Sequence, residues 1–402
     1  MSQLKVNAIR HTGASSDAVT LASDGTCTAK ITNNLSNRNL IINGSMKCAQ
    51  RTTSTTTNNT YSVDRFKVQS GGLDELCTNA QISLSSSDTG PWEKGFRNAL
   101  QITNGNQTSG AGAADYIEIY YYMEDQDIAQ SGWDYTSASS KITLSYWIKS
   151  SVAQKFYGFI YSREAWTGNG KAYSYEISNG GSNLSANTWT KITHTIPGDS
   201  GLAFDNDNTN GLGIAIIPFH GTDVTNSGNT LNTWASWVTA NKTPDMTSTW
   251  YTTNDATLAI TGVQLEVGEV ATDFEHRSYG DELARCQRYF YMHLNPSEGG
   301  PSANYTPICT AYYDNTTTAY GIINFPVTMN HYPDLYKVVG TDYFDLRTGS
   351  TSDTCDTVDL NRSSPTSATI YFTGNVSGTA GNGTMMRSHT NSAARIGFDA
   401  EL

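Results

Sequence analysis

The chain has 402 residues, of which 37% are hydrophobic and 15% charged, and its formal net charge is −12. This length predicts two or three domains. The low hydrophobic share favours sheets with one buried face, because such strands need apolar residues only at alternate positions. An acidic chain without a cluster of Lys and Arg argues against nucleic-acid binding. No apolar run approaches the ~20 residues that span a bilayer, which argues against membrane insertion.

The start of the chain and its cysteines indicate where the protein is made. No apolar leader follows Met1, so we expect synthesis in a cytoplasm without export. In that compartment the six cysteines should remain free thiols. None of them forms a CxxC pair, so neither a zinc site nor dithiol redox chemistry is predicted.

Residues 1–37 form a separate segment. Short apolar alternations, such as Leu4, Val6 and Ala8, are interrupted by turn signals. The segment has too few apolar residues for a core of its own. We expect it to gain that core from a partner, either further copies of itself or a socket on a larger assembly. A disordered tail is the alternative.

Residues 38–277 are predicted to form an all-β domain. Strand-like runs recur between clusters of Gly, Asn, Ser and Asp, and helical periodicity is almost lacking, which is typical of a β-sandwich of the jelly-roll type. The predicted strands are 39–42, 66–68, 116–122, 142–148, 189–196, 211–217 and 256–267.

Residues 278–294 are predicted to be a helix and linker. Ser278 precedes Asp281 in a capping-box pattern, and Leu283, Cys286 and Phe290 follow at helical spacing. This narrow apolar seam can pack on its own domain, or three copies can pack around an axis as an oligomer seam. The length of the helix does not decide between these alternatives.

Residues 295–402 are predicted to form a second β-rich domain. The predicted strands are 307–313, 320–325 and 368–372. A turn is predicted at 330–333, and an exposed Gly/Asn-rich loop at 374–383.

Two long segments of this sequence resemble a known module. Residues 35–291 resemble a module from tail fibres of tailed bacteriophages, particularly phages of cyanobacteria and other aquatic bacteria. The matching runs are 35–46 (LSNRNLIINGSM), 49–51 (AQR), 61–66 (YSVDRF), 260–268 (ITGVQLEVG), 274–279 (FEHRSY) and 282–289 (ELARCQRY). Residues beyond 295 lie outside the match.

The resemblance implies a jelly roll similar to carbohydrate-binding modules, on a homotrimeric fibre of the virion tail. Residues 1–37 would attach to a phage tail or baseplate protein. The fibre would bind polysaccharide or lipopolysaccharide on the host surface during adsorption, after synthesis in the bacterial host cytoplasm. A tail-associated glycan depolymerase and a purely structural virion decoration protein are the alternatives.

The resemblance also bears on metal binding. Related carbohydrate-binding modules hold a structural calcium ion between their first and last strands, and Glu266 is the ligand candidate here. Ser45 and Met46 stand where an acidic ligand is expected near the first strand. We therefore predict no cofactor and no metal ligand, with structural calcium as the alternative.

No enzyme motif stands out in the chain. GxSxG, HExxH, P-loop and GxGxxG patterns do not occur in a fitting context, so we predict no catalytic residue and no enzyme activity. Sugar binding instead needs aromatic faces beside hydrogen-bonding groups. Loop aromatics suit this better than strand aromatics, so Trp147 and Trp189 are predicted to be core. The predicted glycan-binding residues are Trp133, Trp166, Tyr312, Tyr313, His331 and Tyr332. We favour the C-terminal domain as the recognition tip, because loops on a rigid β-scaffold vary without unfolding it.

Overall fold

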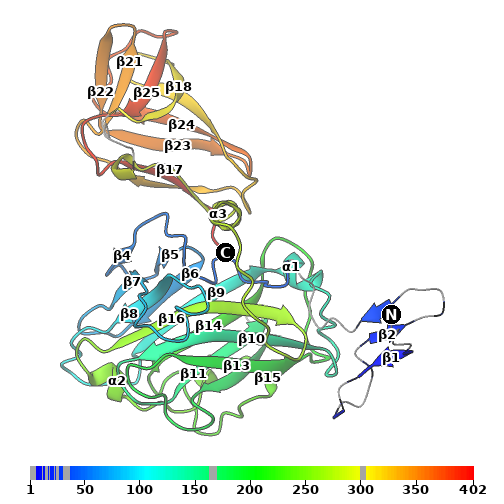
Figure 1. Ribbon diagram of the computed structural model, residues 1–402. Coiled ribbons are helices and arrows are strands. Elements are labelled where there is room, and N and C mark those ends of the chain that lie inside the picture. The colour runs from blue at the N-terminus through cyan, green and yellow to red at the C-terminus, as the bar shows by residue number, and fades with distance from the viewer. Residues whose placement is uncertain are drawn as a thin grey trace.

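The computed structural model describes residues 6–10, 12–13, 17, 19–21, 23, 27–29, 37–162, 170–298 and 305–402. It confirms the all-β class: a large sandwich is followed by helix α3 and a smaller β domain. Figure 1 shows the smaller domain above the sandwich, α3 between them, and a small N-terminal sheet standing off to one side. That sheet consists of β1 (Ala8–Ile9), β2 (Val19–Leu21) and β3 (Cys27–Ala29).

The sandwich is built from two antiparallel sheets. In spatial order, the six-stranded sheet is β13 (Thr190–Pro197), β10 (Lys141–Ser150), β16 (Thr257–Val267), β8 (Asn98–Thr103), β7 (Thr78–Ser83) and β4 (Ser54–Thr55). The seven-stranded sheet is β15 (Trp234–Ser236), β12 (Lys171–Ile177), β11 (Phe156–Ser162), β14 (Asn210–His220), β9 (Tyr116–Glu124), β6 (Phe66–Gly71) and β5 (Thr60–Val63). Neighbours in space are rarely neighbours in sequence, as a jelly roll requires.

Alternation along the strands builds the sandwich core. On β10, Ile142, Leu144, Tyr146 and Ile148 are fully buried and belong to the same cluster as the inward residues of β14 and β9. Successive side chains of a strand point to opposite faces, so the residues between them face outward. The predicted strands at 66–68, 116–122, 142–148, 189–196, 211–217 and 256–267 are therefore confirmed in β6, β9, β10, β13, β14 and β16.

The strand predicted at 39–42 is wrong. Asn39 replaces the sheet ladder with side-chain bonds, since its Oδ1 accepts from the backbone N–H groups of Ile41 at 3.0 Å and Leu265 at 3.1 Å. The segment is therefore held against β16 by one polar side chain, together with a single backbone bond from Leu40 to Leu265.

The helices are short. They are α1 (Asp125–Ala129), α2 (Thr249–Thr252) and α3 (Tyr279–Gln287), with 3-10 turns η2 (Thr239–Asn241) and η3 (Pro296–Glu298). The predicted cap of α3 is confirmed, because Ser278 Oγ accepts from the backbone N–H of Asp281. Within the described ranges, no helix is long and apolar enough to cross a membrane.

The apolar seam of α3 packs on its own chain. Cys286 and Phe290 are fully buried, and the Phe290 ring lies beneath the Arg51 guanidinium, 3.6 Å from its carbon to the ring centroid. Leu283 is half-buried over a hollow that Ala49 also lines. The assignment of Cys286 and Phe290 to an oligomer seam is therefore wrong, because both are already buried within this chain, Cys286 beside Cys48 and Phe290 between Arg51 and Tyr336.

The C-terminal domain packs a small sheet on a large one. The three-stranded sheet is β17 (Phe290–Leu294), β26 (Arg395–Asp399) and β20 (Asp334–Val338). The seven-stranded sheet is β22 (Thr351–Cys355), β21 (Phe344–Thr348), β25 (Gly383–Ser388), β18 (Pro307–Tyr313), β19 (Ala319–Asn324), β24 (Ser367–Thr373) and β23 (Thr357–Ser363). A separate core that includes Phe344, Ile370 and Phe398 fills the space between them.

The end of the chain returns to the junction between the two domains (Figure 1). There the sandwich residues Arg51 and Arg65 pair with Asp399 and Glu401, and we call these four residues the arginine clamp. Both arginine side chains are almost fully buried, at 5% and 2% exposed. The arginine clamp thus joins the beginning of the sandwich domain to the last residues of the C-terminal domain through buried ion pairs.

Candidate functional site

A row of tyrosines crosses the outer face of the large C-terminal sheet. Tyr313, Ile323 and Phe372 point into the domain core, so the residues next to them in sequence face outward. Strand register then aligns Tyr312 on β18 with Tyr320 on β19, and Tyr320 with Tyr371 on β24. We call Tyr312, Tyr320 and Tyr371 the tyrosine strip.

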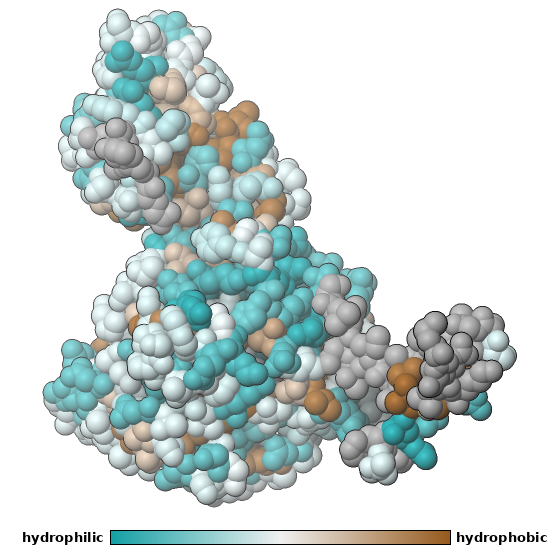
Figure 2. Space-filling model, viewed as in Figure 1, coloured by the Kyte–Doolittle hydropathy of each residue, from teal (hydrophilic) through white to brown (hydrophobic). Residues whose placement is uncertain are grey.

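The rings of the tyrosine strip form a continuous aromatic surface. The ring centroids of Tyr312 and Tyr320 are 6.3 Å apart, and those of Tyr320 and Tyr371 are 5.6 Å apart. Beside them Ile322 is 63% exposed, and Tyr312 is 51% exposed. Figure 2 shows hydrophobic surface on the C-terminal domain in the view of Figure 1. Contiguous apolar exposure of this kind is typical of a binding surface.

Hydrogen-bonding groups surround the strip. The hydroxyls of its three tyrosines have no partner among the described residues. A shallow hollow of about 680 Å³ runs along this face, lined by Thr310, Ala311, Tyr312, Tyr320, Gly321, Ile322, Asn324 and Thr369. The surface therefore offers apolar faces and free polar groups side by side, which is the chemistry of sugar recognition.

Six residues were predicted to bind glycan, and the predictions for Trp133 and Tyr313 are wrong. Trp133 is 3% exposed within the sandwich core, and its Nε1 donates to the Ser140 carbonyl at 3.3 Å. Tyr313 is also 3% exposed and belongs to the core of the C-terminal domain. Neither ring can stack on a sugar without unpacking a core. Trp166 lies outside the described residues.

His331 and Tyr332 are exposed but separate from the tyrosine strip in the fold. They lie in the turn before β20, on the side of the three-stranded sheet, and Tyr332 is 68% exposed. His331 contacts the backbone carbonyls of Tyr332 at 2.8 Å and Glu401 at 3.4 Å through its two ring nitrogens. Among the described residues of the predicted set, only Tyr312 lines the hollow along the tyrosine strip.

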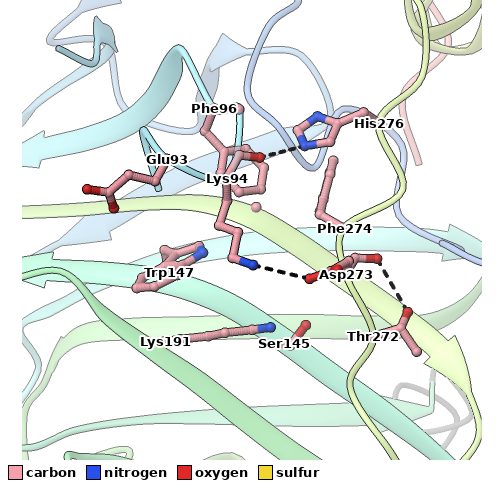
Figure 3. A pocket seen from close by; sticks show the side chains of 12 residues that line it. Glu93, Lys94, Phe96, Ser145, Trp147, Lys191, Thr272, Asp273, Phe274 and His276 are labelled. Atoms are coloured by element: carbon pink, nitrogen blue, oxygen red, sulfur yellow. Dashed lines mark hydrogen bonds and ion pairs between the residues drawn. The ribbon is translucent and has the colours of Figure 1, made fainter. Parts of the chain in front are cut away.

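The sandwich has a groove on the outer face of its six-stranded sheet, with a volume of about 520 Å³ (Figure 3). Its floor is Ser145 and Trp147 on β10, with Lys191 on β13 directly opposite Trp147 in the strand register. We call this the sandwich groove. One wall is the aromatic group Phe96, Phe274 and His276, with ring centroids 4.8 to 5.2 Å apart.

Two contacts fasten the walls of the sandwich groove. His276 Nε2 lies 2.8 Å from the Lys94 carbonyl oxygen, which ties the two covering segments together. Lys94 Nζ also lies 3.4 Å from Asp273 Oδ1, and both side chains are exposed, so this ion pair contributes little to stability. The groove is therefore shaped mainly by aromatic packing.

Trp147 was predicted to be core and instead lies half-buried in the floor of the groove. The signal was present in the sequence. Tyr146 and Trp147 are adjacent on one strand and must face opposite sides, and Tyr146 is fully buried in the core.

The Glu266 carboxylate, the calcium-ligand candidate, is engaged by hydrogen-bond donors of its own chain. It is 1% exposed and accepts hydrogen bonds from Thr272 Oγ1 at 2.7 Å and Gln264 Nε2 at 2.9 Å. In the part of the chain that the structure describes, no group of three or more His, Cys, Asp or Glu residues could hold a metal ion.

No family model matches the chain, and no curated protein matches its sequence. Among solved structures, it is similar to the CBM22-1–GH10 modules of Clostridium thermocellum endo-1,4-β-D-xylanase 10B complexed with xylohexaose, at 11% identity and a TM-score of 0.26, covering 62% of this chain and 35% of that one.

Two further structures are carbohydrate-binding modules. A family 30 carbohydrate-binding module has 8% identity and a TM-score of 0.24, with 52% of this chain and 83% of that one covered. The CBM22-1–CBM22-2 tandem domain of Paenibacillus barcinonensis Xyn10C has 8% identity and a TM-score of 0.24, with 83% and 93% covered.

Proposed function

We propose that this protein is a glycan-binding tail-fibre protein of a tailed bacteriophage, which attaches to host surface polysaccharide or lipopolysaccharide without cleaving it. The observation that best supports glycan binding is the tyrosine strip, three aromatic rings side by side on an uncovered sheet face with free hydroxyls. Large aromatic side chains that serve only the fold are usually buried.

The chemistry of the strip suits a saccharide. The apolar C–H face of a pyranose can stack on a tyrosine ring, while sugar hydroxyls bond with Thr310, Asn324 and the tyrosine hydroxyls. The described residues that line this hollow include no Asp or Glu. Hydrolysis of a glycan uses a pair of carboxyl groups across the scissile bond, so this surface favours binding.

The fibre assignment is supported by sequence and by the N-terminal segment. Residues 35–291 resemble the phage tail-fibre module, and the N-terminal sheet leaves Ile9 56% and Leu21 39% exposed. A segment with uncovered apolar residues suits attachment to a tail or baseplate protein, or to copies of itself in a homotrimer. In a trimer, weak sugar sites bind together and raise the effective affinity.

The tyrosine strip is tested by replacing its central residue. We expect Tyr320→Ala in the full-length chain to weaken binding to a responsive polysaccharide from a bacterial surface-glycan panel by roughly tenfold, about 1.4 kcal/mol. Loss of the central ring interrupts the stack, whereas Tyr320→Phe keeps the ring and should retain most of the affinity. The measurement is surface plasmon resonance, with circular dichroism to verify folding.

Tyr332→Ala is the matched comparison, because that ring is exposed but lies on the other side of the domain. Equal loss of binding in Tyr332→Ala and Tyr320→Ala, or unchanged binding in Tyr320→Ala, would contradict the role of the strip. Release of reducing ends from the bound polysaccharide would favour a depolymerase instead.

A further inference from the structure

The floor of the sandwich groove presents hydrogen-bond donors that nothing in the described chain uses. Ser145 is 3% exposed and lines the groove, and its hydroxyl has no hydrogen-bond partner among the described residues. The Trp147 indole nitrogen and the Lys191 ammonium have none there either. An indole N–H and an ammonium can only donate hydrogen bonds, so a ligand that binds to the floor should supply hydrogen-bond acceptors.

The orientation of Trp147 places its donor in the open part of the groove. A Cβ at Gly90 would lie 2.7 Å from Cζ3 and 2.9 Å from Cη2 of Trp147, so that turn covers the six-membered end of the ring. The nitrogen is at the opposite end, which in Figure 3 is the end facing Lys94. The ring can therefore offer both its N–H group and part of its face to one ligand.

The charged group on the floor itself is a cation, Lys191. Of the two carboxylates that line the groove, Asp273 pairs with Lys94, whereas Glu93 accepts from the backbone N–H of Gly90 at 2.5 Å and keeps its charge. Lys191 lacks such a partner among the described residues. An anionic group on a ligand can therefore pair with the Lys191 ammonium beside the aromatic wall of Phe96, Phe274 and His276.

We propose that the sandwich groove is a second binding site, specific for a saccharide that bears a carboxylate, such as a uronic acid residue. The carboxylate accepts from Lys191, Ser145 and the Trp147 indole N–H, and the sugar ring packs against the aromatic surfaces. This site goes beyond the proposed function, because it lies on the other domain and selects for charge, whereas the tyrosine strip presents an uncharged surface.

The probe for this site is a galacturonic acid pentamer, with its fully methyl-esterified form as the uncharged counterpart. We expect calorimetric titration of the full-length chain at low salt to show binding of the acid form at least fivefold tighter than the ester. The affinity should fall as salt is added, because the Lys191 ammonium lies at the surface and is screened.

Variants separate the groove from the rest of the molecule. Lys191→Gln and Trp147→Phe should each weaken binding of the acid form at least fivefold, the second because the ring stays but the N–H group is lost. Lys155→Gln is the charge-matched control, since Lys155 pairs with Glu176 on the other sheet at 3.0 Å. Tyr320→Ala should leave pentamer binding unchanged, which distinguishes this site from the proposed function.

The proposal would be overturned by no binding of the acid pentamer, equal affinity for acid and ester, full affinity in Lys191→Gln, or an equal loss in Lys155→Gln. Inorganic phosphate that displaces the pentamer at equal concentration would also overturn it, because the site would then be a general anion hollow without sugar selectivity.

Discussion

Replacing Arg65 with Met should destabilise the junction between the two domains by about 3–5 kcal/mol. Arg65 and Glu401 pair with side chains only 2% and 6% exposed, so the substitution leaves the buried Glu401 carboxylate with Arg51, 3.4 Å away, in place of two cations. The Arg65 guanidinium also stacks over the Tyr289 ring, 3.4 Å from its carbon to the centroid, and that contact is lost as well. We expect the last residues of the chain to detach from the sandwich.

Calorimetry and limited proteolysis measure this effect. The wild-type domains should unfold together, whereas in Arg65→Met the C-terminal domain should melt earlier and residues 288–298 should become sensitive to protease. Arg65→Met combined with Glu401→Gln should cost less than the single change, because no uncompensated charge remains. Arg362→Met, at an exposed position on β23, is the control and should have little effect. A normal melting profile in Arg65→Met would show that the arginine clamp does not hold the domains together.

The second large effect is expected at Glu118, inside the seven-stranded sheet of the sandwich. Its side chain is 1% exposed and accepts from His220 at 2.7 Å, Lys242 at 2.9 Å and Gln69 at 2.6 Å. Burial alone would raise the pKa of Glu118, but the hydrogen bond from His220 and the charge of Lys242 outweigh it and lower the pKa to about 2. Burial lowers the pKa of His220 below its ordinary value of 6.5, so the imidazole is neutral at pH 7.

Glu118→Gln should therefore cost on the order of 3 kcal/mol at pH 7, since Lys242 loses its counter-charge in a mostly buried position. The folded pKa lies below the ordinary value of 4.5, so ionised Glu118 stabilises the fold above that pH. This contribution is lost as the pH falls from 4.5 to about 2. Denaturant unfolding should show a wide gap between wild type and variant at pH 7 and a narrow gap near pH 2.

Glu176→Gln is the matched control, because Glu176 pairs with Lys155 at the surface. This substitution should lower the free energy of unfolding by less than about 1 kcal/mol. A gap between wild type and Glu118→Gln that stays constant across this pH range would contradict an ionised, depressed Glu118. Such a result would mean that the variant only disturbs packing.

The sequence by itself determined the all-β class and the places of most strands. Alternation of apolar residues, as in Ile142, Leu144 and Ile148, reflects the side-chain period of two in a strand, and it can be recognised in the sequence alone. The start of α3 was equally legible, because a cap depends on Ser278 and Asp281, which are neighbours in the chain.

Only the tertiary structure decided which aromatic residues face solvent. Tyr312 and Tyr313 are adjacent and chemically identical, yet one is exposed and the other is core, because the second sheet covers one face of β18. Trp133, in a polar loop, is buried for the same reason: distant strands close over it.

The tyrosine strip and the sandwich groove could not be predicted from the sequence, because each consists of residues from several strands. Strand register places Tyr312, Tyr320 and Tyr371 in one row, although the first and last are 59 positions apart in the sequence (371 − 312). Likewise, Phe290 follows the helical spacing of a seam, but its ring is covered by Arg51, which is distant from it in the sequence. Such meetings depend on which strands pair and which faces are covered, and long-range packing determines both.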